Sequence, residues 1–423
     1  MFSKPPRVVV VGGGFGGIYA ASYLAKSDLA TDPGVEITLV DSKNYFTFTP
    51  LIAEVAAGTL GREHVTYPHR TLAAERGFQF LHACVTGVDH ARKVVSTDAG
   101  DVPYDYLVIA SGAEPQYFGN AEIAARSMAF ATVEHALQVR SRVIDALEHA
   151  QKIDDETERR RMLTFVIAGG GPAGIEIASE IHGLVHQVLS DFYSCADEAR
   201  VIVAVASDRI LIGFDEALAA MGLEELRRRG IEVLLDTLVT GIGDGSVLVK
   251  GAGGACEIES HTLIWTAGTT PGSWLQEIGF PTERGALVVD RYLRVSGREC
   301  EFAVGDVAYL VDERLGKPYP RVAPIAISQG IRAAANIENA VLQRAQEPYH
   351  AFHAGKIVSL GSGVALAEVL GIRLTGRLAW MIYRGAYLLK LVGMRNKVKV
   401  AITLMLNRIF GPDIAYEEGR SGL

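Results

Sequence analysis

Three glycines, Gly12, Gly14 and Gly17, are the first residues whose type and spacing indicate chemistry. They follow the β-branched run Val8–Val11 and lead into a helix-like stretch, Ile18–Ala25. At this spacing the first glycine permits a tight turn, the second lets a pyrophosphate approach the backbone, and the third allows close helix–strand packing. The free N–H groups of the helix N-terminus favour the phosphate charge. This first fingerprint predicts a dinucleotide site.

The same pattern occurs again 157 residues later. The apolar stretch Leu163–Ala168 leads into Gly169, Gly171 and Gly174, and the helix-like stretch Ile175–Leu189 follows. One glycine-rich turn arises easily by chance, but two in this context form an internal repeat of fold. Two dinucleotide sites predict two redox cofactors in series, a tightly bound FAD and a transient NAD(P)H.

Polar and small residues at other strand ends extend these two sites. Asp41 follows the strand-like run Val35–Val40, where an acid can accept hydrogen bonds from an adenosine ribose. The run Tyr106–Gly112 ends in small residues that allow close approach of a ligand. In Phe302–Ala308, Asp306 could bind flavin ribityl hydroxyls or cap the helix that follows, and both interpretations stay open.

Composition narrows the class of protein. The chain has 423 residues, 49% hydrophobic residues and 45 glycines, which predicts an α/β enzyme of two or three domains. Its net charge of −8 argues against nucleic-acid binding. No apolar run reaches the roughly 18–20 residues of a membrane span. The widely spaced Cys84, Cys195, Cys256 and Cys300 predict buried, reduced thiols in a cytoplasm-facing protein.

We expect no metal site. His182 and His186 are four residues apart, but no acid or cysteine is spaced to complete a site with them. They are therefore interpreted as histidines on a helix surface.

The C-terminal part is basic and apolar. Between Val369 and Pro412 there is no acidic residue. Eight cations lie there: Arg373, Arg377, Arg384, Lys390, Arg395, Lys397, Lys399 and Arg408. Val398, Ile402, Met405 and Ile409 recur on one helical face. This pattern predicts a helix that binds an anionic membrane surface; the alternative is a helical pair that caps the core or forms a dimer contact.

Several blocks together resemble the two-dinucleotide-binding-domain flavoproteins and, within them, the type II NADH:quinone oxidoreductases. The blocks are VVVGGGFGG, LVDSKNY, TPLIAEVAAGTL, YLVIASGAEP, FVIAGGGPAGIEIASEI, IWTAGTTP, AVGDVA and AWMIYRGAYL. PLIAEVAAG is the most discriminating block. The disulfide reductases of this superfamily carry a CxxxxC pair after the first fingerprint, whereas this chain has no cysteine before Cys84.

The resemblance implies an α/β fold with two Rossmann-like domains and a C-terminal helical membrane-association region. Residues 1–125 and 285–350 would bind FAD, 126–284 would bind NAD(P)H, and 351–423 would contact the membrane. The residues implied to line FAD are Gly12, Gly14, Phe15, Gly17, Asp41, Pro50, Val85, Ala110, Gly112, Gly305 and Asp306. Those implied for NAD(P)H are Gly169, Gly171, Gly174, Ala267 and Gly268, with Glu176 as the catalytic acid.

Glu176 is expected in the first turn of its helix. There the family's acid lies near nicotinamide and flavin and influences electron transfer to quinone. The alternative is a carboxylate favoured only by the helix dipole.

Two departures from the family pattern concern the donor and the acceptor. Val205 stands where the family carries a ribose-binding acid, and Arg209 is near enough to meet a 2′-phosphate, so NADPH or dual use is a hypothesis beside NADH. The stretch Ala323–Gln329 keeps Ala323, Ala326 and Gln329 of the quinone-side motif. Pro324 and Ser328 replace glutamines there, which leaves the type of quinone and the class of acceptor open.

The leading hypothesis is therefore a non-proton-pumping flavoenzyme that passes two electrons from NAD(P)H through FAD to a membrane quinone. We expect it on the cytoplasmic face of the cell membrane, and a homodimer is one expectation for its assembly. The alternatives are a soluble NAD(P)H-dependent reductase of a protein or small-molecule acceptor, and a flavin-binding redox sensor.

Overall fold

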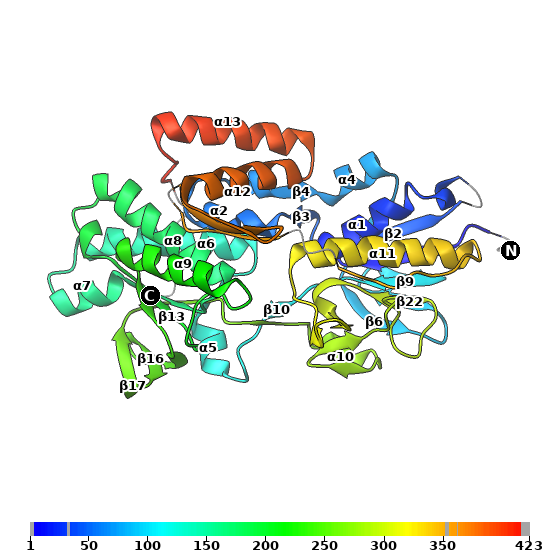
Figure 1. Ribbon diagram of the computed structural model, residues 1–423, viewed down its shortest axis with the longest axis horizontal. Helices are drawn as coiled ribbons and strands as arrows, with labels where there is room; N and C mark the ends of the chain where they lie inside the picture. Colours follow the sequence, from blue (N-terminus) through cyan, green and yellow to red (C-terminus); the bar gives the residue numbers. More distant parts are fainter. Residues whose placement is uncertain (1–3, 32–33, 352–354, 362, 416–423) are drawn as a thin grey trace. The chain divides into compact units, whose positions relative to one another are not determined.

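Each fingerprint follows the central strand of its own parallel sheet in the computed structural model (Figure 1). The structure describes residues 4–31, 34–351, 355–361 and 363–415. It divides into two compact units. Unit 1 comprises Met1–Thr47, Thr66–Glu114 and Thr269–Phe352, and unit 2 comprises Phe48–Val65, Pro115–Gly268 and His353–Leu423.

Unit 1 contains a five-stranded parallel sheet. Its strand order is β22 (Glu301–Ala303), β9 (Tyr106–Ile109), β1 (Arg7–Val11), β2 (Glu36–Asp41) and β5 (Gln79–His82). Val8–Val11 are at most 4% exposed, because both faces of a parallel sheet are covered, and this explains the continuous apolar run.

Helices α1 (Phe15–Leu24) and α11 (Ala323–Val341) pack together almost backbone to backbone in unit 1. A Cβ at Gly330 would lie 2.2 Å from the carbonyl oxygen of Gly16. A side chain at Gly330 would therefore push the two helices apart.

Unit 2 repeats this arrangement. Its parallel sheet has the order β14 (Glu232–Leu234), β13 (Arg200–Ala204), β12 (Thr164–Ala168), β18 (Thr262–Trp265) and β11 (Met128–Ala129). The helices of this part are α5 (Ala121–Arg126), α6 (Val133–Ala150), α7 (Glu156–Met162), α8 (Pro172–Gly183) and α9 (Glu216–Arg228).

Each unit also carries a three-stranded antiparallel sheet at a corresponding place in the chain. In unit 1 it is β6 (Val85–Asp89), β7 (Val94–Thr97) and β8 (Gly100–Pro103). In unit 2 it is β15 (Leu238–Ile242), β16 (Ser246–Gly251) and β17 (Gly254–Glu259). The internal repeat therefore extends beyond the fingerprints.

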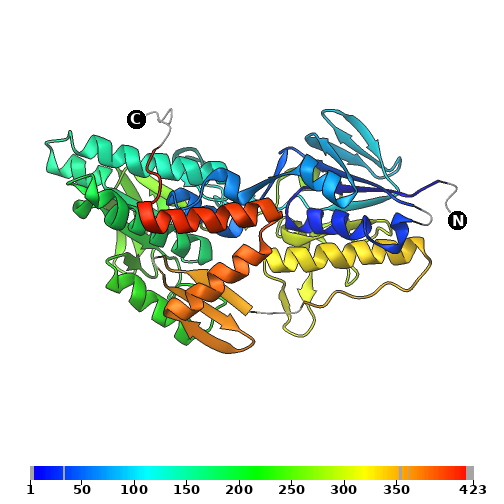
Figure 2. The same cartoon turned by 90° about the horizontal axis from the view of Figure 1, so that it is seen from above.

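The C-terminal part of unit 2 adds a further sheet and two long helices (Figure 2). The sheet consists of β26 (Gly355–Ser359), β27 (Ala365–Val369) and β28 (Ile372–Thr375), and the helices are α12 (Gly376–Lys390) and α13 (Met394–Phe410). Helix α12 packs on β27, and α13 contacts both α12 and the short helix α3 (Arg62–Val65). The segment Phe48–Val65 also supplies α2 (Ile52–Ala56), which packs on α6 and α8.

Smaller elements complete both units. They are β3 (Tyr45–Thr47), β4 (Thr66–Pro68), α4 (His69–Arg76), β10 (Glu114–Pro115), β19 (Thr269–Thr270), α10 (Trp274–Glu277), β20 (Thr282–Glu283), β21 (Ala286–Val288), β23 (Ala308–Tyr309), β24 (Val311–Asp312) and β25 (Lys317–Pro318).

Several local expectations from the sequence were wrong. The helix expected over Ile175–Leu189 ends at Gly183 and continues as a π-helical turn, Leu184–Val188. Cys84 and Cys256 are exposed, because both lie at the edges of the small antiparallel sheets rather than in a core.

Candidate nucleotide-binding sites and a carboxylate cluster

The first fingerprint has two crowded glycines and one open glycine. Gly12 has φ +102°, and a Cβ there would lie 2.4 Å from the carbonyl oxygen of Ala110. A Cβ at Gly17 would lie 1.9 Å from the carbonyl oxygen of Gly12. Gly14, at the N-cap of α1, has no atom within 4 Å of such a Cβ. This open space beside free N–H groups fits a pyrophosphate.

Asp41 lies beside this turn, at the end of β2. Its Oδ1 accepts a hydrogen bond from the Lys43 N–H at 2.6 Å, and its Oδ2 accepts one from the Gly13 N–H. The carboxylate is thus held at the strand end and remains partly exposed. Its position fits the ribose-binding role implied for it.

His69 was missed in the sequence, where no motif marks it. Its ring is fully buried against Gly13, and neither ring nitrogen has a hydrogen-bond partner in the described part of the chain. Burial lowers the pKa of His69, while the nearby Asp41 opposes that shift. A neutral imidazole ring therefore packs against the backbone of the first fingerprint at Gly13.

The other residues implied to line FAD belong to unit 1, with one exception. Ala110 follows β9, Val85 begins β6, and the ring of Phe15 stands edge-on to Phe46 at 5.0 Å. Gly112 and Gly305 have positive φ, and Asp306 lies within a 3₁₀ turn, Gly305–Val307, rather than at a helix cap. Burial raises the pKa of Asp306. Pro50 belongs to unit 2.

The stretch Ala323–Gln329 begins helix α11. Gln329 is buried, and its Oε1 accepts the Gly305 N–H at 2.7 Å. Ala326 packs close to Gly305 as well. Pro324 lies in the first turn of α11, where its missing N–H has little cost. The Ser328 hydroxyl pairs with the Tyr349 hydroxyl at 2.8 Å. These residues support the Gly305–Val307 turn.

The second fingerprint has the same geometry in unit 2. A Cβ at Gly169 would lie 2.6 Å from Thr266 Oγ1, and one at Gly174 would lie 2.0 Å from the carbonyl oxygen of Gly169. Gly171 is exposed and open, like Gly14. Ala267 and Gly268 follow β18, and Gly268 has φ +101°. The residues present therefore fit a second dinucleotide.

Backbone hydrogen bonds place Val205 at the position of Asp41. The Gly12 N–H donates to the Val40 carbonyl at 2.8 Å, and the Gly169 N–H donates to the Ala204 carbonyl at 2.9 Å. The next residue in each unit is therefore equivalent, an acid in unit 1 and a buried valine in unit 2.

Arg209 follows Val205 by four residues. Its guanidinium forms an ion pair with Glu216 at 2.8 Å, and the Glu216 side chain is 86% exposed. A pair this exposed is weak.

Glu176 is the fifth residue of α8, so its expected place in the first turn was wrong: the helix begins at Pro172. Its Oε1 accepts a hydrogen bond from the Ser359 N–H at 3.2 Å. Burial, and then the nearby Glu180 and Glu54, raise the pKa of Glu176 to about 8, against the Ser359 bond. The helix dipole therefore does not dominate at this acid.

Glu176 belongs to a carboxylate cluster that the sequence analysis missed. We define this cluster as Glu54 of α2, Glu176 and Glu180 of α8, and Tyr383 and Arg384 of α12. Arg384 forms an ion pair with Glu54, and the Tyr383 hydroxyl donates to Glu54 Oε1 at 3.4 Å. The i, i+4 spacing of Glu176 and Glu180 was the available signal, whereas their contact with α2 and α12 was not visible.

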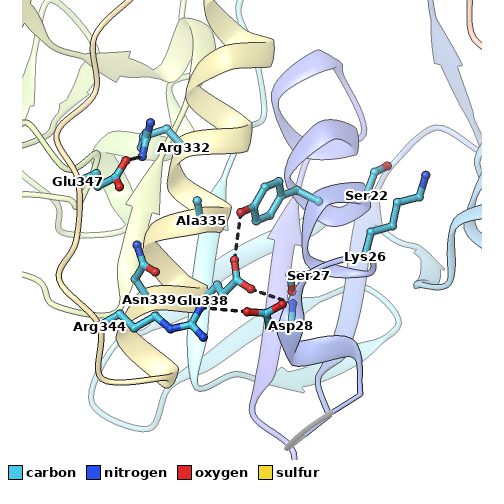
Figure 3. Close-up of a pocket in the computed structure, with 11 residues that line it drawn as sticks. Ser22, Lys26, Ser27, Asp28, Arg332, Ala335, Glu338, Asn339, Arg344 and Glu347 are labelled. Atoms are coloured by element: carbon cyan, nitrogen blue, oxygen red, sulfur yellow. Dashed lines mark hydrogen bonds and ion pairs between the residues drawn. The ribbon is translucent and has the colours of Figure 1, made fainter.

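A pocket of about 550 Å³ in unit 1 lies at the opposite end of α1 from Gly14 (Figure 3). Five of its charged side chains, those of Asp28, Arg332, Glu338, Arg344 and Glu347, already have partners. Arg332 pairs with Glu347, Arg344 pairs with Asp28 at 3.0 Å, and Glu338 accepts the Tyr23 hydroxyl at 3.0 Å. These contacts join α1 to α11 and its following loop, and their role is structural.

Within the described ranges, no group of three or more His, Cys, Asp or Glu side chains is placed to hold a metal ion. His182 and His186 stack with ring centroids 4.5 Å apart, and burial lowers the pKa of His182 to about 4. Among these same residues, no helix is both long and apolar enough to cross a membrane.

Comparison with known proteins assigns the family. Residues 6–330 match the family model described as pyridine nucleotide-disulphide oxidoreductase. The chain is 31% identical to the type II NADH:quinone oxidoreductase NdhA of Mycobacterium tuberculosis, with 93% of this chain and 85% of that protein aligned. It is 30% identical to the type II NADH:quinone oxidoreductase Ndh of the same organism, over 95% and 88%.

A solved structure agrees on the fold. NDH2 from Plasmodium falciparum in complex with NADH superposes with a TM-score of 0.89 at 18% identity, covering 97% of this chain and all of that one. The fold and the paired nucleotide sites thus define a pyridine nucleotide-disulphide oxidoreductase, a family whose members bind FAD and NAD(P)H. Within that superfamily, the chain belongs to the type II NADH:quinone oxidoreductases.

Proposed function

We propose that this chain oxidises NAD(P)H, passes two electrons through FAD and reduces a membrane quinone. The observation that carries the proposal is the pair of matched fingerprints, each with two crowded glycines and one open glycine. Unit 1 would hold FAD and unit 2 would receive NAD(P)H. When bound, the flavin accepts hydride from the nicotinamide, and the chain's own residues bind and orient the two nucleotides.

Steady-state turnover of the full chain tests this proposal. We expect oxidation of NADH or NADPH with ubiquinone or menaquinone as the acceptor, and a yellow purified protein. Turnover with a ferredoxin but with neither quinone would instead support the soluble reductase. A protein without flavin absorbance would contradict both schemes.

The orientation of α13 supports attachment to a membrane surface. Its side facing the rest of unit 2 is polar: Asn396 donates to the His64 carbonyl, Thr403 bonds to His64 Nε2 at 2.9 Å, and Asn407 donates to the Thr59 carbonyl at 2.7 Å. Val400 is buried between them. The helix is therefore fixed by polar contacts on its inner side.

The outer side of α13 is apolar. Seven of its side chains are between 47% and 80% exposed: Met394, Val398, Ile402, Met405, Leu406, Ile409 and Phe410. Leu378, Met381 and Leu389 of α12 are also exposed. An apolar surface of this size on one element, with cations beside it, marks a membrane or protein contact.

Two of the eight cations between Val369 and Pro412 form ion pairs with acids of the same unit. Arg384 pairs with Glu54, and Arg373 pairs with Asp215 at 2.5 Å. The other six form no ion pair with the residues that the structure describes, although Lys397 donates to the Leu389 carbonyl at 2.7 Å; they are Arg377, Lys390, Arg395, Lys397, Lys399 and Arg408. We propose that this surface holds the enzyme on the cytoplasmic leaflet.

Sedimentation with anionic vesicles tests this surface. Ile402→Asn should lower vesicle binding several-fold, because Ile402 is 53% exposed on the outer side of α13. Leu238→Asn is the matched control, since Leu238 is 52% exposed on β15. Equal binding by both variants and the wild type would reject the surface.

A homodimer stays a prediction. Sedimentation velocity of the detergent-free protein would test it directly.

A further inference from the structure

A tight turn in unit 2 holds an aromatic residue in an unfavourable backbone conformation. The Asn120 N–H closes this turn by donating to the Tyr117 carbonyl at 2.9 Å. The two central residues, Phe118 and Gly119, have φ of +52° and +79°. Positive φ at both central positions is the pattern of a type I′ turn, which asparagine followed by glycine fills most easily. A bulky residue is strained there, so the turn by itself would favour asparagine at position 118.

Burial does not compensate for the strain at Phe118. This residue is 69% exposed, whereas the ring of its neighbour Tyr117 stacks on Trp265 of β18 with ring centroids 5.9 Å apart. Phe118 therefore adds little to the core of unit 2. Residues that remain in a strained conformation concentrate at ligand-binding sites, where the strain serves binding rather than folding.

The Phe118 ring lies against the loop that follows β18. Its Cζ is 3.2 Å from the position that a Cβ of Gly268 would occupy. The Gln116 N–H donates to the Gly268 carbonyl at 3.1 Å, which ties the chain before the turn to the same residue. Gly268 is exposed as well. The aromatic ring and this glycine therefore share one accessible surface.

The strand order places this surface at one end of the second nucleotide site. Strands β13, β12 and β18 are parallel neighbours, with β12 in the middle. A dinucleotide on such a sheet lies across the carboxyl ends of the strands. Its pyrophosphate would lie at Gly171, after β12, and its adenosine ribose at Val205, after β13. The nicotinamide half would then extend to the other side, over Gly268 and towards Phe118.

We propose that Phe118 stacks on the nicotinamide half of NAD(P)H and makes the site prefer a nicotinamide dinucleotide over an adenosine phosphate. The inference rests on the proposed function, in which unit 2 receives NAD(P)H. The face of a phenyl ring is electron-rich, so it attracts a flat, electron-poor ring such as nicotinamide, most strongly in its cationic oxidised form. Because Phe118 and Val205 lie on opposite sides of the pyrophosphate, the ring serves NADH and NADPH alike.

Titration calorimetry with two probes separates the two halves of the nucleotide. NAD⁺ carries both halves, whereas ADP carries only the adenosine and the pyrophosphate. With the full-length, flavin-loaded protein, Phe118→Ala should weaken NAD⁺ binding about tenfold, because it removes a stacking partner, and leave ADP binding unchanged. Phe118→Tyr keeps an aromatic ring and should retain the wild-type affinity for both.

Phe192→Ala is the matched control. Phe192 belongs to the same unit and is 63% exposed, but it has an ordinary φ of −115°. It lies beyond the C-terminal end of α8, whereas the second fingerprint lies at the N-terminal end. This variant should bind both probes like the wild type. Unchanged NAD⁺ affinity in Phe118→Ala, or equal loss for NAD⁺ and ADP, would overturn the inference.

Thermal unfolding distinguishes stacking on a ligand from a role in folding. Phe118→Asn provides the residue that the turn favours, so Tm without nucleotide should rise by about 2 °C. Its NAD⁺ affinity should nevertheless fall as in Phe118→Ala. A lower Tm together with weaker binding of both probes would assign the ring to folding and overturn the inference.

Steady-state kinetics complete the test. Phe118→Ala should raise KM for NADH and for NADPH by the same factor, because the ring lies away from the 2′-phosphate. A change in the NADH/NADPH ratio would contradict the placement of Phe118 at the nicotinamide end. A wild-type protein that neither binds NAD⁺ nor oxidises NAD(P)H would contradict the proposed function itself, which distinguishes the two failures.

Discussion

The two fingerprints have nearly the same backbone and different chemistry at the neighbouring strand end. In both, a Cβ at the third glycine would lie about 2 Å from the carbonyl oxygen of the first, 1.9 Å for Gly17 and 2.0 Å for Gly174. In unit 1 the next strand ends in Asp41, whose carboxylate binds two N–H groups. In unit 2 it ends in buried Val205. The glycines thus set the same turn in both units, and the chemistry differs at the neighbouring strand end.

Asp41 of unit 1 and Glu176 of unit 2 also differ in their hydrogen bonds and in their charged neighbours. Asp41 is satisfied by hydrogen bonds and suits a resident cofactor. Glu176 has one backbone N–H and two acidic neighbours, so it keeps a proton until about pH 8.

The largest effect should come from filling the crowded glycines. Gly17→Ala should yield protein without flavin, because a Cβ cannot lie 1.9 Å from an oxygen and α1 must move. Gly174→Ala should keep flavin and lose at least about tenfold in apparent affinity for NAD(P)H. Flavin absorbance and KM provide the measurements.

Gly87→Ala is the control for these substitutions, because its site is open and its φ is not positive. If Gly17→Ala retained full flavin content, the assignment of FAD to unit 1 would be wrong. Loss of flavin in Gly174→Ala would contradict the division of roles between the units.

The next largest effect should come from removing Asp41, the acid at the strand end of unit 1. Asp41→Ala should weaken FAD binding about tenfold or more, since it removes the ribose acceptor and leaves the Gly13 N–H without its partner, at about 1–3 kcal/mol. Flavin release on dilution, followed by fluorescence, measures this change. Unchanged retention would show that Asp41 does not bind the ribose.

A smaller effect should follow from placing an acid at Val205, the position in unit 2 that is equivalent to Asp41. Val205→Glu should raise KM for NADPH relative to NADH by about tenfold, because a carboxylate repels a 2′-phosphate and accepts ribose hydroxyls. Val205→Leu controls for size. A constant NADH/NADPH ratio across the three proteins would remove Val205 from the specificity site.

The smallest effect is on stability. The pKa of Glu176 lies at about 8 in the folded protein and near 4.5 in the unfolded chain. Between these values the folded state binds more protons, so stability decreases as pH rises from 4.5 to 8. Glu176→Gln removes this contribution and should reduce the decrease in Tm by about 2 °C. A steeper decrease in the variant would contradict the sign.

Local sequence determined both nucleotide-binding turns. A strand, three spaced glycines and a helix follow one another directly in the chain, so Gly12–Gly17 and Gly169–Gly174 were predicted correctly as strand–turn–helix units. Asp41 and Val205 could be compared because each follows its strand directly. The periodicity of Val398, Ile402, Met405 and Ile409 likewise indicated which side of α13 is apolar.

Only the tertiary structure decided which distant residues meet. Glu54, Glu180 and Arg384 are separated by more than 120 residues at each step. Helix α2 packs on α8, and the ion pair between Glu54 and Arg384 joins α2 to α12. His69 lies under Gly13 for the same reason. The polar inner side of α13 was also hidden, because its partners lie in the segment Phe48–Val65. Periodicity reports which face of an element is apolar, whereas the charge and protonation of a buried group depend on neighbours that folding brings from elsewhere in the chain.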